Sequence, residues 1–298
     1  MEPLEHFKEY VERFQQFNFN DFSKIYHSLY SDYKNIQDRI EFSLLINPKD
    51  GFDLRFGLFK IYESQKISSL FTKMGFGNYN LENILSSVEN FVPEFAVGFD
   101  FNKKIPRTKV YFLRLPDNII FNENPTKIIN FTSKLININL TNCNEQEIKD
   151  CYLMAIDFCQ NDKQNIKIYT RNKNVNLDII NNYLKDNHIS SQYFKKFQEL
   201  FSEGQLKDVT ISRKYSQIQN NPKGLSVFFE VEDNLNESIE QLVKTCIPEK
   251  FSDFKEIVET LEMNKPVKYS HIGVTFSENT KKENICLYFS PVLENIKK

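Results

Sequence analysis

Hydrophobic residues alternate with other residues in ten short segments of the chain, and these segments come in five pairs. A period of two is typical of β-strands with one covered and one open face. Short polar or Gly/Pro-containing stretches join the two members of each pair, as in a β-hairpin. The predicted strand pairs are 39–47 with 52–62, 95–101 with 107–115, 151–159 with 165–171, 208–216 with 225–233, and 268–277 with 284–291. The longest predicted turn covers 217–224.

Segments with helical periodicity lie between the hairpins. They cover 81–92, 176–186, 190–203, 236–246 and 251–262, and hydrogen-bond acceptors such as Asn236 and Ser252 mark two helix starts. Repetition of helices and hairpins at this scale favours a closed or stacked architecture over independent domains. We therefore predict an α+β fold with helices outside a ten-stranded antiparallel β-barrel, built from five α-β-β-α repeats as a single domain over residues 1–298.

Charged residues occupy one face of several predicted strands. In FDLRFGLFKIY, residues 52–62, Phe56 and its alternate neighbours share one face, and Arg55 lies on the other. In the strand at 107–115, Val110 and Phe112 oppose Lys109 and Tyr111. A barrel of ten strands is too wide to be filled by its own side chains, so the second face is expected to line a chamber.

Basic residues recur on that second face in three successive hairpins, as Arg55, Lys109 and Lys167. Closing the sheet would bring them towards one zone, where a group of cations would bind a multiply charged anion such as a phosphate or diphosphate. Aromatic rings on the same face could shield a cation or stack on a flat ligand. They are Tyr111, Tyr169 and Tyr288.

Composition narrows the function further. The 298 residues are 40% apolar and carry a formal charge of −2, which gives no global attraction for nucleic acid or an anionic membrane. Five cysteines without a CxxC pair, and an N-terminus unlike a signal peptide, predict a reduced, cytoplasmic protein, and no stretch is long enough for a membrane-spanning helix. The sequence contains no DDxxD, GxSxG, HExxH, Walker A or GxGxxG motif. We expect a soluble monomer.

The hairpin order over nearly the whole chain, with the stretches KVYFLRLPDN, IKIY, IGVTF and CLYFS, resembles the ABBA aromatic prenyltransferases, in particular the soluble CloQ/NphB-type branch that prenylates phenols and phenazines. The resemblance implies a PT barrel that transfers a prenyl group from an allylic diphosphate to an electron-rich aromatic acceptor by electrophilic substitution. Its partners would be these two small molecules.

The resemblance also implies roles for individual residues. Arg55, Lys109 and Lys167 would be the catalytic cations that stabilise the leaving diphosphate. Some family members have a magnesium-binding aspartate at the position of Arg55, whereas metal-independent members have a basic residue there, so no metal or other cofactor is expected. The expected substrate-binding residues are Ser43, Arg55, Lys109, Tyr111, Lys167, Tyr169, Lys214, Lys223, His271 and Tyr288.

Two positions depart from the family pattern. Asn284 stands where a diphosphate-binding lysine is expected and Gly224 where an arginine is expected, although Lys214, Lys223 or Arg213 could compensate. The catalytic base is not identified, and Glu230 is a candidate because it is predicted to share the face of Ser226 and Phe228.

Three alternatives stay open at this point. The first is a non-catalytic barrel that holds a lipid or aromatic metabolite, but an apolar carrier has little reason to bury several cations. The second is an RNA-binding β-surface, which the near-neutral charge disfavours. The third is a barrel of the same family that has lost its activity.

Overall fold

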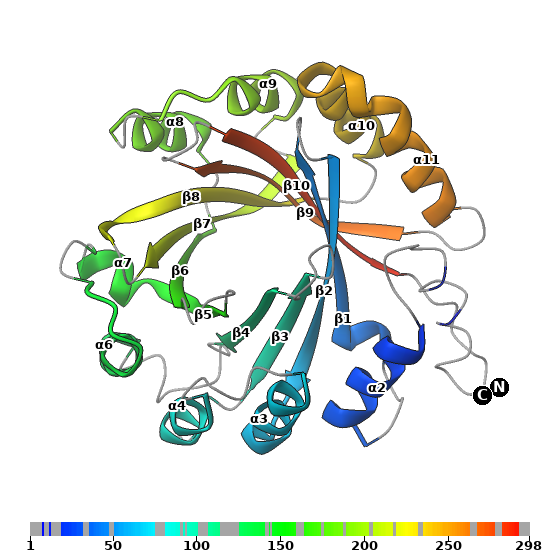
Figure 1. The fold of residues 1–298 in the computed structure, drawn as a ribbon. Coiled ribbons are helices and arrows are strands. Elements are labelled where there is room, and N and C mark those ends of the chain that lie inside the picture. Colours follow the sequence, from blue (N-terminus) through cyan, green and yellow to red (C-terminus); the bar gives the residue numbers. More distant parts are fainter. Residues whose placement is uncertain are drawn as a thin grey trace. The chain divides into compact units, whose positions relative to one another are not determined.

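A computed structural model gives the fold of the chain (Figure 1). The structure describes residues 8, 12, 19–31, 36–47, 51–74, 81–89, 92, 94–100, 107–113, 125–140, 143, 145–158, 164–173, 176–186, 189–202, 205–216, 219–231, 235–262, 267–277 and 282–291.

Ten antiparallel strands form a closed barrel in the order β1-β10-β9-β8-β7-β6-β5-β4-β3-β2. The strands are β1 (Ile40–Asn47), β2 (Gly51–Ile61), β3 (Phe95–Asp100), β4 (Arg107–Leu113), β5 (Cys151–Phe158), β6 (Gln164–Asn172), β7 (Leu206–Ser216), β8 (Gln219–Val231), β9 (Val267–Ser277) and β10 (Lys282–Pro291). The predicted barrel of five hairpins is confirmed. One boundary is wrong, because β8 already begins at Gln219, inside the turn predicted over 217–224.

Pairs of helices separate successive hairpins along the chain. The helices are α2 (Phe19–Leu29), η1 (Ile36–Arg39), α3 (Ser64–Lys73), α4 (Leu81–Val88), α6 (Pro125–Leu135), α7 (Glu145–Lys149), α8 (Leu177–Asp186), α9 (Gln192–Leu200), α10 (Asn236–Cys246), η3 (Pro248–Lys250) and α11 (Phe251–Glu262). None of the helices in the described ranges combines the length and the apolar character needed to cross a membrane.

Side-chain acceptors begin some of these helices, although not at the predicted places. Ser191 accepts a hydrogen bond from the Phe194 N–H at 2.8 Å and caps α9. By contrast, α10 begins directly at Asn236 after Leu235, which offers no side-chain cap, and α11 begins at Phe251, before Ser252.

The internal contacts of the chain divide into two compact units. Unit 1 comprises residues 1–40, 55–170 and 213–223, and unit 2 comprises 41–54, 171–212 and 224–298. Each unit is described separately below.

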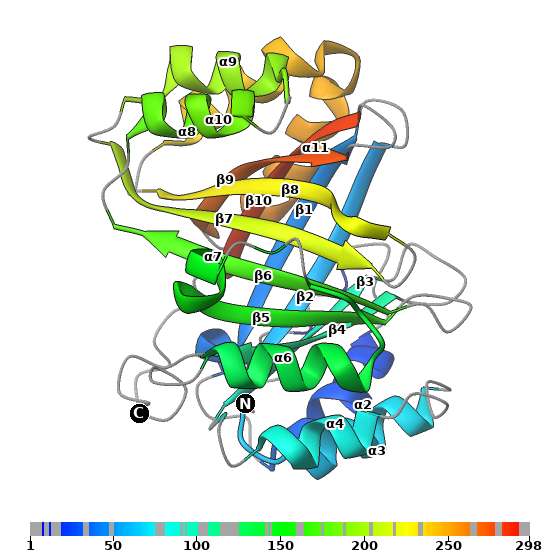
Figure 2. The same cartoon turned by 90° about the vertical axis from the view of Figure 1, so that its left-hand side faces the viewer.

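In unit 1, helices cover one face of β2 to β5, and Figures 1 and 2 both place α3, α4 and α6 on that side. Phe56 of β2 packs edge-on against Phe22 of α2, with ring centroids 5.4 Å apart. Phe158 of β5 packs against Phe71 of α3 at 5.4 Å. Since neighbouring residues of a strand point to opposite faces, these contacts fix Arg55 and Asp157 on the face away from the helices.

In unit 2, α9 and α10 cover one face of the strands (Figure 2). Phe229 of β8 stacks on Phe197 of α9, with ring centroids 4.5 Å apart, so Phe228 and Glu230 lie on the opposite face. A carboxylate ties the start of α9 to β10, because Glu283 accepts hydrogen bonds from the Tyr193 N–H at 2.9 Å and the Ser191 hydroxyl at 3.1 Å. An anion at this helix N-terminus is favourable.

Candidate active site

Among the described residues of unit 1, four basic side chains gather on the face that the helices leave uncovered. Arg55 lies on β2, Lys109 on β4, Lys167 on β6 and Lys214 in the part of β7 that belongs to unit 1. The strand register places Lys109 and Lys167 on either side of β5, since Lys109 pairs with Asp157 and Lys167 with Ala155, one alternate position away. The structure therefore brings the three predicted catalytic cations together and adds Lys214 to them.

Two aspartates that the sequence analysis did not single out also belong to this cluster. Asp100 Oδ2 lies 3.5 Å from Arg55 Nε. Asp157 lies between two lysines, with Oδ1 3.6 Å from Lys109 Nζ and Oδ2 3.5 Å from Lys214 Nζ.

Positive charge remains in excess in this cluster. With Lys167 protonated, four basic groups face two carboxylates, and the net charge is plus two. A net positive, partly desolvated group of Arg and Lys side chains suits a diphosphate.

Lys167 has a strongly perturbed titration. Burial, reinforced by the nearby charge of Lys109, lowers the pKa of its ammonium from 10.5 to about 7, while Asp157 opposes the shift. The side chain nevertheless keeps accessible surface. Lys167 is therefore poised to gain a proton when an anion arrives, because an added negative charge favours the charged ammonium.

Two of the predicted aromatic residues lie on the same face. The rings of Tyr111 and Tyr169 are tilted relative to each other, with centroids 6.4 Å apart. Tyr111 lies over Gly98 of β3, where a Cβ atom would come within 3.2 Å of the Tyr111 ring. Gly98 thus leaves room for a ring beside the cation cluster, and the two tyrosines offer π faces to a carbocation.

Three other predicted binding residues, Ser43, His271 and Tyr288, lie in unit 2. Ser43 of β1 pairs with Tyr288 of β10, and both are partly accessible. The Tyr288 ring meets Phe228 edge-on at 5.5 Å and His271 at 6.0 Å. Gly273 makes space for Phe228, because a Cβ atom there would come within 2.4 Å of that ring. Unit 2 therefore carries an aromatic wall on its uncovered face.

A β-bulge in β9 brings a polar side chain to the same face as these aromatic rings. Tyr288 pairs with His271 but Phe289 pairs with Tyr269, so Ser270 is an extra residue and shares the face of His271. Ser270 donates a hydrogen bond to Glu41 Oε2 at 2.9 Å, and its hydroxyl lies 3.1 Å from His271 Nδ1.

Glu41 and His271, the two ionisable groups that the Ser270 hydroxyl contacts, both have shifted pKa values. Burial raises the pKa of the Glu41 carboxyl to about 7, which the hydrogen bond from Ser270 partly offsets. Burial, reinforced by the charge of Arg171, lowers the pKa of His271 to about 4. His271 is therefore neutral at neutral pH, and Glu41 is a carboxyl group that can exchange a proton there. Glu41 is not among the site residues predicted from the sequence.

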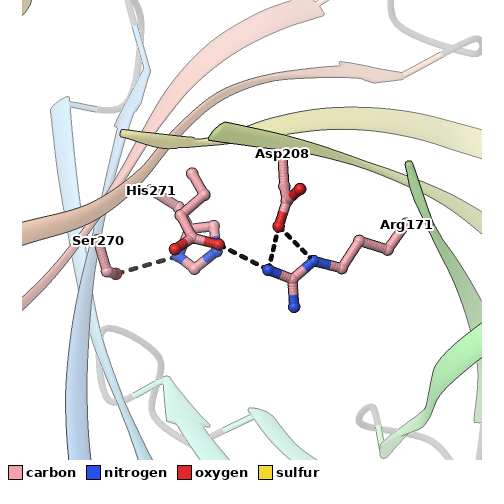
Figure 3. A network of polar contacts seen from close by, with 5 residues as sticks. Arg171, Asp208, Ser270 and His271 are labelled. Atoms are coloured by element: carbon pink, nitrogen blue, oxygen red, sulfur yellow. Dashed lines mark hydrogen bonds and ion pairs between the residues drawn. The ribbon is translucent and has the colours of Figure 1, made fainter. Parts of the chain in front are cut away.

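Arg171, near the end of β6, contacts carboxylates near the ends of β7 and β8. Its Nε lies 2.9 Å from Asp208 Oδ2, and its Nη2 lies 2.7 Å from Glu230 Oε2. Figure 3 shows Arg171 reaching to Asp208, with Ser270 beside the His271 ring. The Glu230 carboxylate is thus engaged by the Arg171 guanidinium, so Glu230 is a structural ion-pair partner more than a free proton acceptor.

The remaining predicted positions have varied outcomes. Arg213 points to the helix side, where its Nε lies 3.0 Å from Glu147 Oε1 of α7, on the opposite face from the cation cluster. The side chain of Lys223 lies outside the described residues. At Gly224 a Cβ atom would meet the Phe276 carbonyl oxygen at 3.0 Å, which leaves little space for an arginine. Asn284 donates a hydrogen bond to Thr275 Oγ1 at 3.2 Å.

The described residues do not fit a magnesium site of the kind that some family members have. No group of three or more His, Cys, Asp or Glu side chains within the described ranges is arranged to hold a metal ion. The position that an aspartate would need holds Arg55, whose guanidinium would repel a divalent cation.

Comparisons with known proteins place the fold. No protein-family model and no curated protein matches the sequence. Among solved structures, the chain is similar to 6-dimethylallyltryptophan synthase from Micromonospora olivasterospora in complex with DMASPP and Trp, with a TM-score of 0.74, 9% identity and 97% of each chain covered. It is also similar to 5-dimethylallyltryptophan synthase from Streptomyces coelicolor, with a TM-score of 0.70, 10% identity and 97% of each chain covered.

A third similar structure is the prenyltransferase PriB in complex with its product diphosphate. The TM-score is 0.71 at 10% identity, and the alignment covers 97% of this chain and 96% of that one. The chain thus has the barrel fold of the aromatic prenyltransferases.

Proposed function

We propose that this protein is an aromatic prenyltransferase that transfers a prenyl group from an allylic diphosphate to an electron-rich aromatic acceptor. The observation that carries the proposal is the cation cluster of unit 1, formed by Arg55, Lys109, Lys167 and Lys214 in a prenyltransferase barrel. A carrier of apolar metabolites would gain nothing from grouping four basic side chains at the expense of their hydration.

The cation cluster would act on the first chemical step. The allylic C–O bond breaks, the diphosphate leaves with the bonding electron pair, and positive charge develops on the allylic carbon. Fixed cations stabilise the charge that accumulates on the diphosphate, and because they are already in place they need little reorganisation. Tyr111 and Tyr169, whose rings lie 6.4 Å apart, would shield the allylic cation from water.

The uncovered face of unit 2 suits an aromatic acceptor. Tyr288, Phe228 and His271 offer rings against which a flat molecule can pack. When the acceptor ring forms the new C–C bond it becomes cationic, and it must then lose a proton to regain aromaticity. Glu41, with a pKa of about 7, is better suited to accept that proton than Glu230, which is paired with Arg171.

We further propose that transfer does not require magnesium, since Arg55 supplies a positive charge at the position where metal-dependent members would hold the ion. The resemblance to the CloQ/NphB-type branch suggests a phenol or phenazine acceptor, whereas the two dimethylallyltryptophan synthases with this fold suggest an indole. The acceptor panel in the test therefore contains all three classes.

The test is product formation followed by mass spectrometry. The protein is incubated with dimethylallyl, geranyl and farnesyl diphosphates and with phenols, dihydroxynaphthalenes, phenazines and indoles, with excess EDTA in half of the samples. We expect a prenylated product that persists in EDTA and disappears with Arg55→Ala or Lys109→Ala. Glu147→Gln is the control, because it breaks an ion pair on the helix side. Ligand-induced thermal stabilisation without any product would instead support the non-catalytic barrel.

A further inference from the structure

Asp157 of β5 contacts two lysines that come from two other strands. Its side chain is almost fully buried, and its two oxygens lie 3.6 Å from Lys109 Nζ and 3.5 Å from Lys214 Nζ. These separations exceed the roughly 2.7–2.9 Å of a charge-assisted hydrogen bond. The carboxylate therefore holds both ammonium groups mainly by charge, and an arriving anion can compete for them.

Lys167 depends on the same carboxylate. The charged groups that face it are Arg55 of β2, Lys109 of β4, Asp157 of β5 and Lys214 of β7. Among them only Asp157 favours the protonated ammonium, whereas burial and the three cations favour the neutral amine. The second carboxylate of this face, Asp100, is paired with Arg55.

We propose that Asp157 is a positioning residue of the donor site, which holds Lys109 and Lys214 in place beside Lys167 for the diphosphate. This inference rests on the proposed function, because it assumes that the cluster binds a diphosphate. It assigns a supporting role to a residue whose charge has the wrong sign for direct contact with that ligand.

Removal of the Asp157 charge should then change diphosphate affinity in the direction opposite to the one that simple electrostatics predicts. Removing a negative charge from an anion site should tighten anion binding at every pH. If Asp157 keeps Lys167 protonated, however, its loss leaves three cations around Lys167 without compensation. Lys167 then loses its proton at a lower pH, and the site has one positive charge fewer near neutral pH.

The experiment is isothermal titration calorimetry of inorganic diphosphate binding, in excess EDTA, from about pH 5.5 to about pH 9. It compares the wild type, Asp157→Asn and the control Glu147→Gln, which removes the charge of a carboxylate in an ion pair on the helix side. In the wild type, affinity should fall as the pH rises through about 7.

Asp157→Asn should move this midpoint down by about one pH unit, which corresponds to about tenfold weaker binding at pH 7.5 and a change within about twofold at pH 5.5. Glu147→Gln should follow the wild type. If Asp157→Asn does not fold, Asp157→Glu replaces it, and it should keep the wild-type midpoint because it retains the charge.

The outcomes separate the two proposals. Tighter binding by Asp157→Asn at every pH with an unchanged midpoint would mean that Asp157 only competes with the ligand, which overturns the positioning role and leaves the proposed function intact. A shifted midpoint in Asp157→Glu would overturn the role as well. Absence of diphosphate binding to the wild type at any pH would overturn the proposed function and this inference with it.

Discussion

Replacement of Lys167 by methionine should stabilise the fold and abolish donor binding at the same time. The pKa of Lys167 is about 7 in the folded protein, against 10.5 for an ordinary lysine. Each pH unit of difference corresponds to about 1.4 kcal/mol, so the buried ammonium destabilises the folded state by up to about 5 kcal/mol. Methionine has a similar length and no charge, and it removes this penalty.

The sign of the pH dependence follows from the same two pKa values. Because the folded-state pKa lies below the unfolded one, the penalty is fully present below about pH 7 and fades as the pH rises towards 10.5. The free energy of unfolding of Lys167→Met should therefore exceed that of the wild type by about 2–5 kcal/mol at pH 6 and by about 2 kcal/mol or less at pH 9.

Urea unfolding followed by circular dichroism at the two pH values measures this difference. Lys127→Met, at an exposed position of α6, is the control for the chemical change, and it should differ little from the wild type at either pH. A wild type that is more stable than Lys167→Met at pH 6, or a difference that does not depend on pH, would show that the Lys167 ammonium titrates normally. The argument for a desolvated cation cluster would then fail.

Four further predictions test single features of the structure. Glu283→Ala should lower the free energy of unfolding by about 1–3 kcal/mol, because α9 loses the acceptor for its Tyr193 N–H, and Glu283→Gln should lower it less in the same urea assay. Lys60→Gly should raise the free energy of unfolding by about 0.5–1 kcal/mol, because the φ of Lys60 is 58°, a left-handed conformation that glycine adopts without strain. An unchanged or lower melting temperature would contradict this. Gly98→Ala should push the Tyr111 ring aside and raise KM with little loss of stability, as steady-state kinetics would show. Glu41→Gln should remove the rise of kcat with pH through about 7, where the wild-type carboxyl becomes ionised, and a retained rise would exclude it as the base.

The hairpins and most helices could be predicted from the sequence because their hydrophobic periodicity is unbroken. The start of β8 could not. Residues 219–224 have the Asn, Pro and Gly composition of a turn, yet the strand begins at Gln219. Pairing with a neighbouring strand overrides such local preferences, and Gly224, which pairs with Ser277 of β9, is already part of the ladder.

The face of each cation was predictable, but its partner was not. Alternation along a strand assigns Arg55 and Lys109 to the uncovered face, whereas the register between strands decides which side chains meet. Asp100 and Asp157 lie at or near strand ends beside predicted turns, where an aspartate is unremarkable in sequence. The sequence offered one signal. Alternation places Asp100 on the same face of its strand as Gly98, and Asp157 on the same face as Ala155.

The bulge at Ser270 could not be predicted from the sequence either, because it too depends on the pairing between strands. Strict alternation would place Ser270 on the covered face together with Ile272. One extra residue between the pairs of Tyr288 and Phe289 turns the Ser270 hydroxyl to the uncovered face, where it reaches Glu41. Nothing in the local sequence marks this insertion, and Glu41 alone reads as one polar residue in an alternating strand.

The uncovered face of each unit suits a different step of the proposed reaction. A leaving diphosphate requires fixed positive charge, and unit 1 supplies it in excess over Asp100 and Asp157. A cationic ring intermediate requires a proton acceptor, and burial makes the carboxylate of Glu41 in unit 2 more basic while it is still partly ionised near neutral pH. In both units burial shifts a pKa towards 7, downwards for Lys167 and upwards for Glu41. The same desolvation therefore tunes an anion-binding amine and a proton-accepting carboxyl, and each is less stable in its charged form than it would be in water.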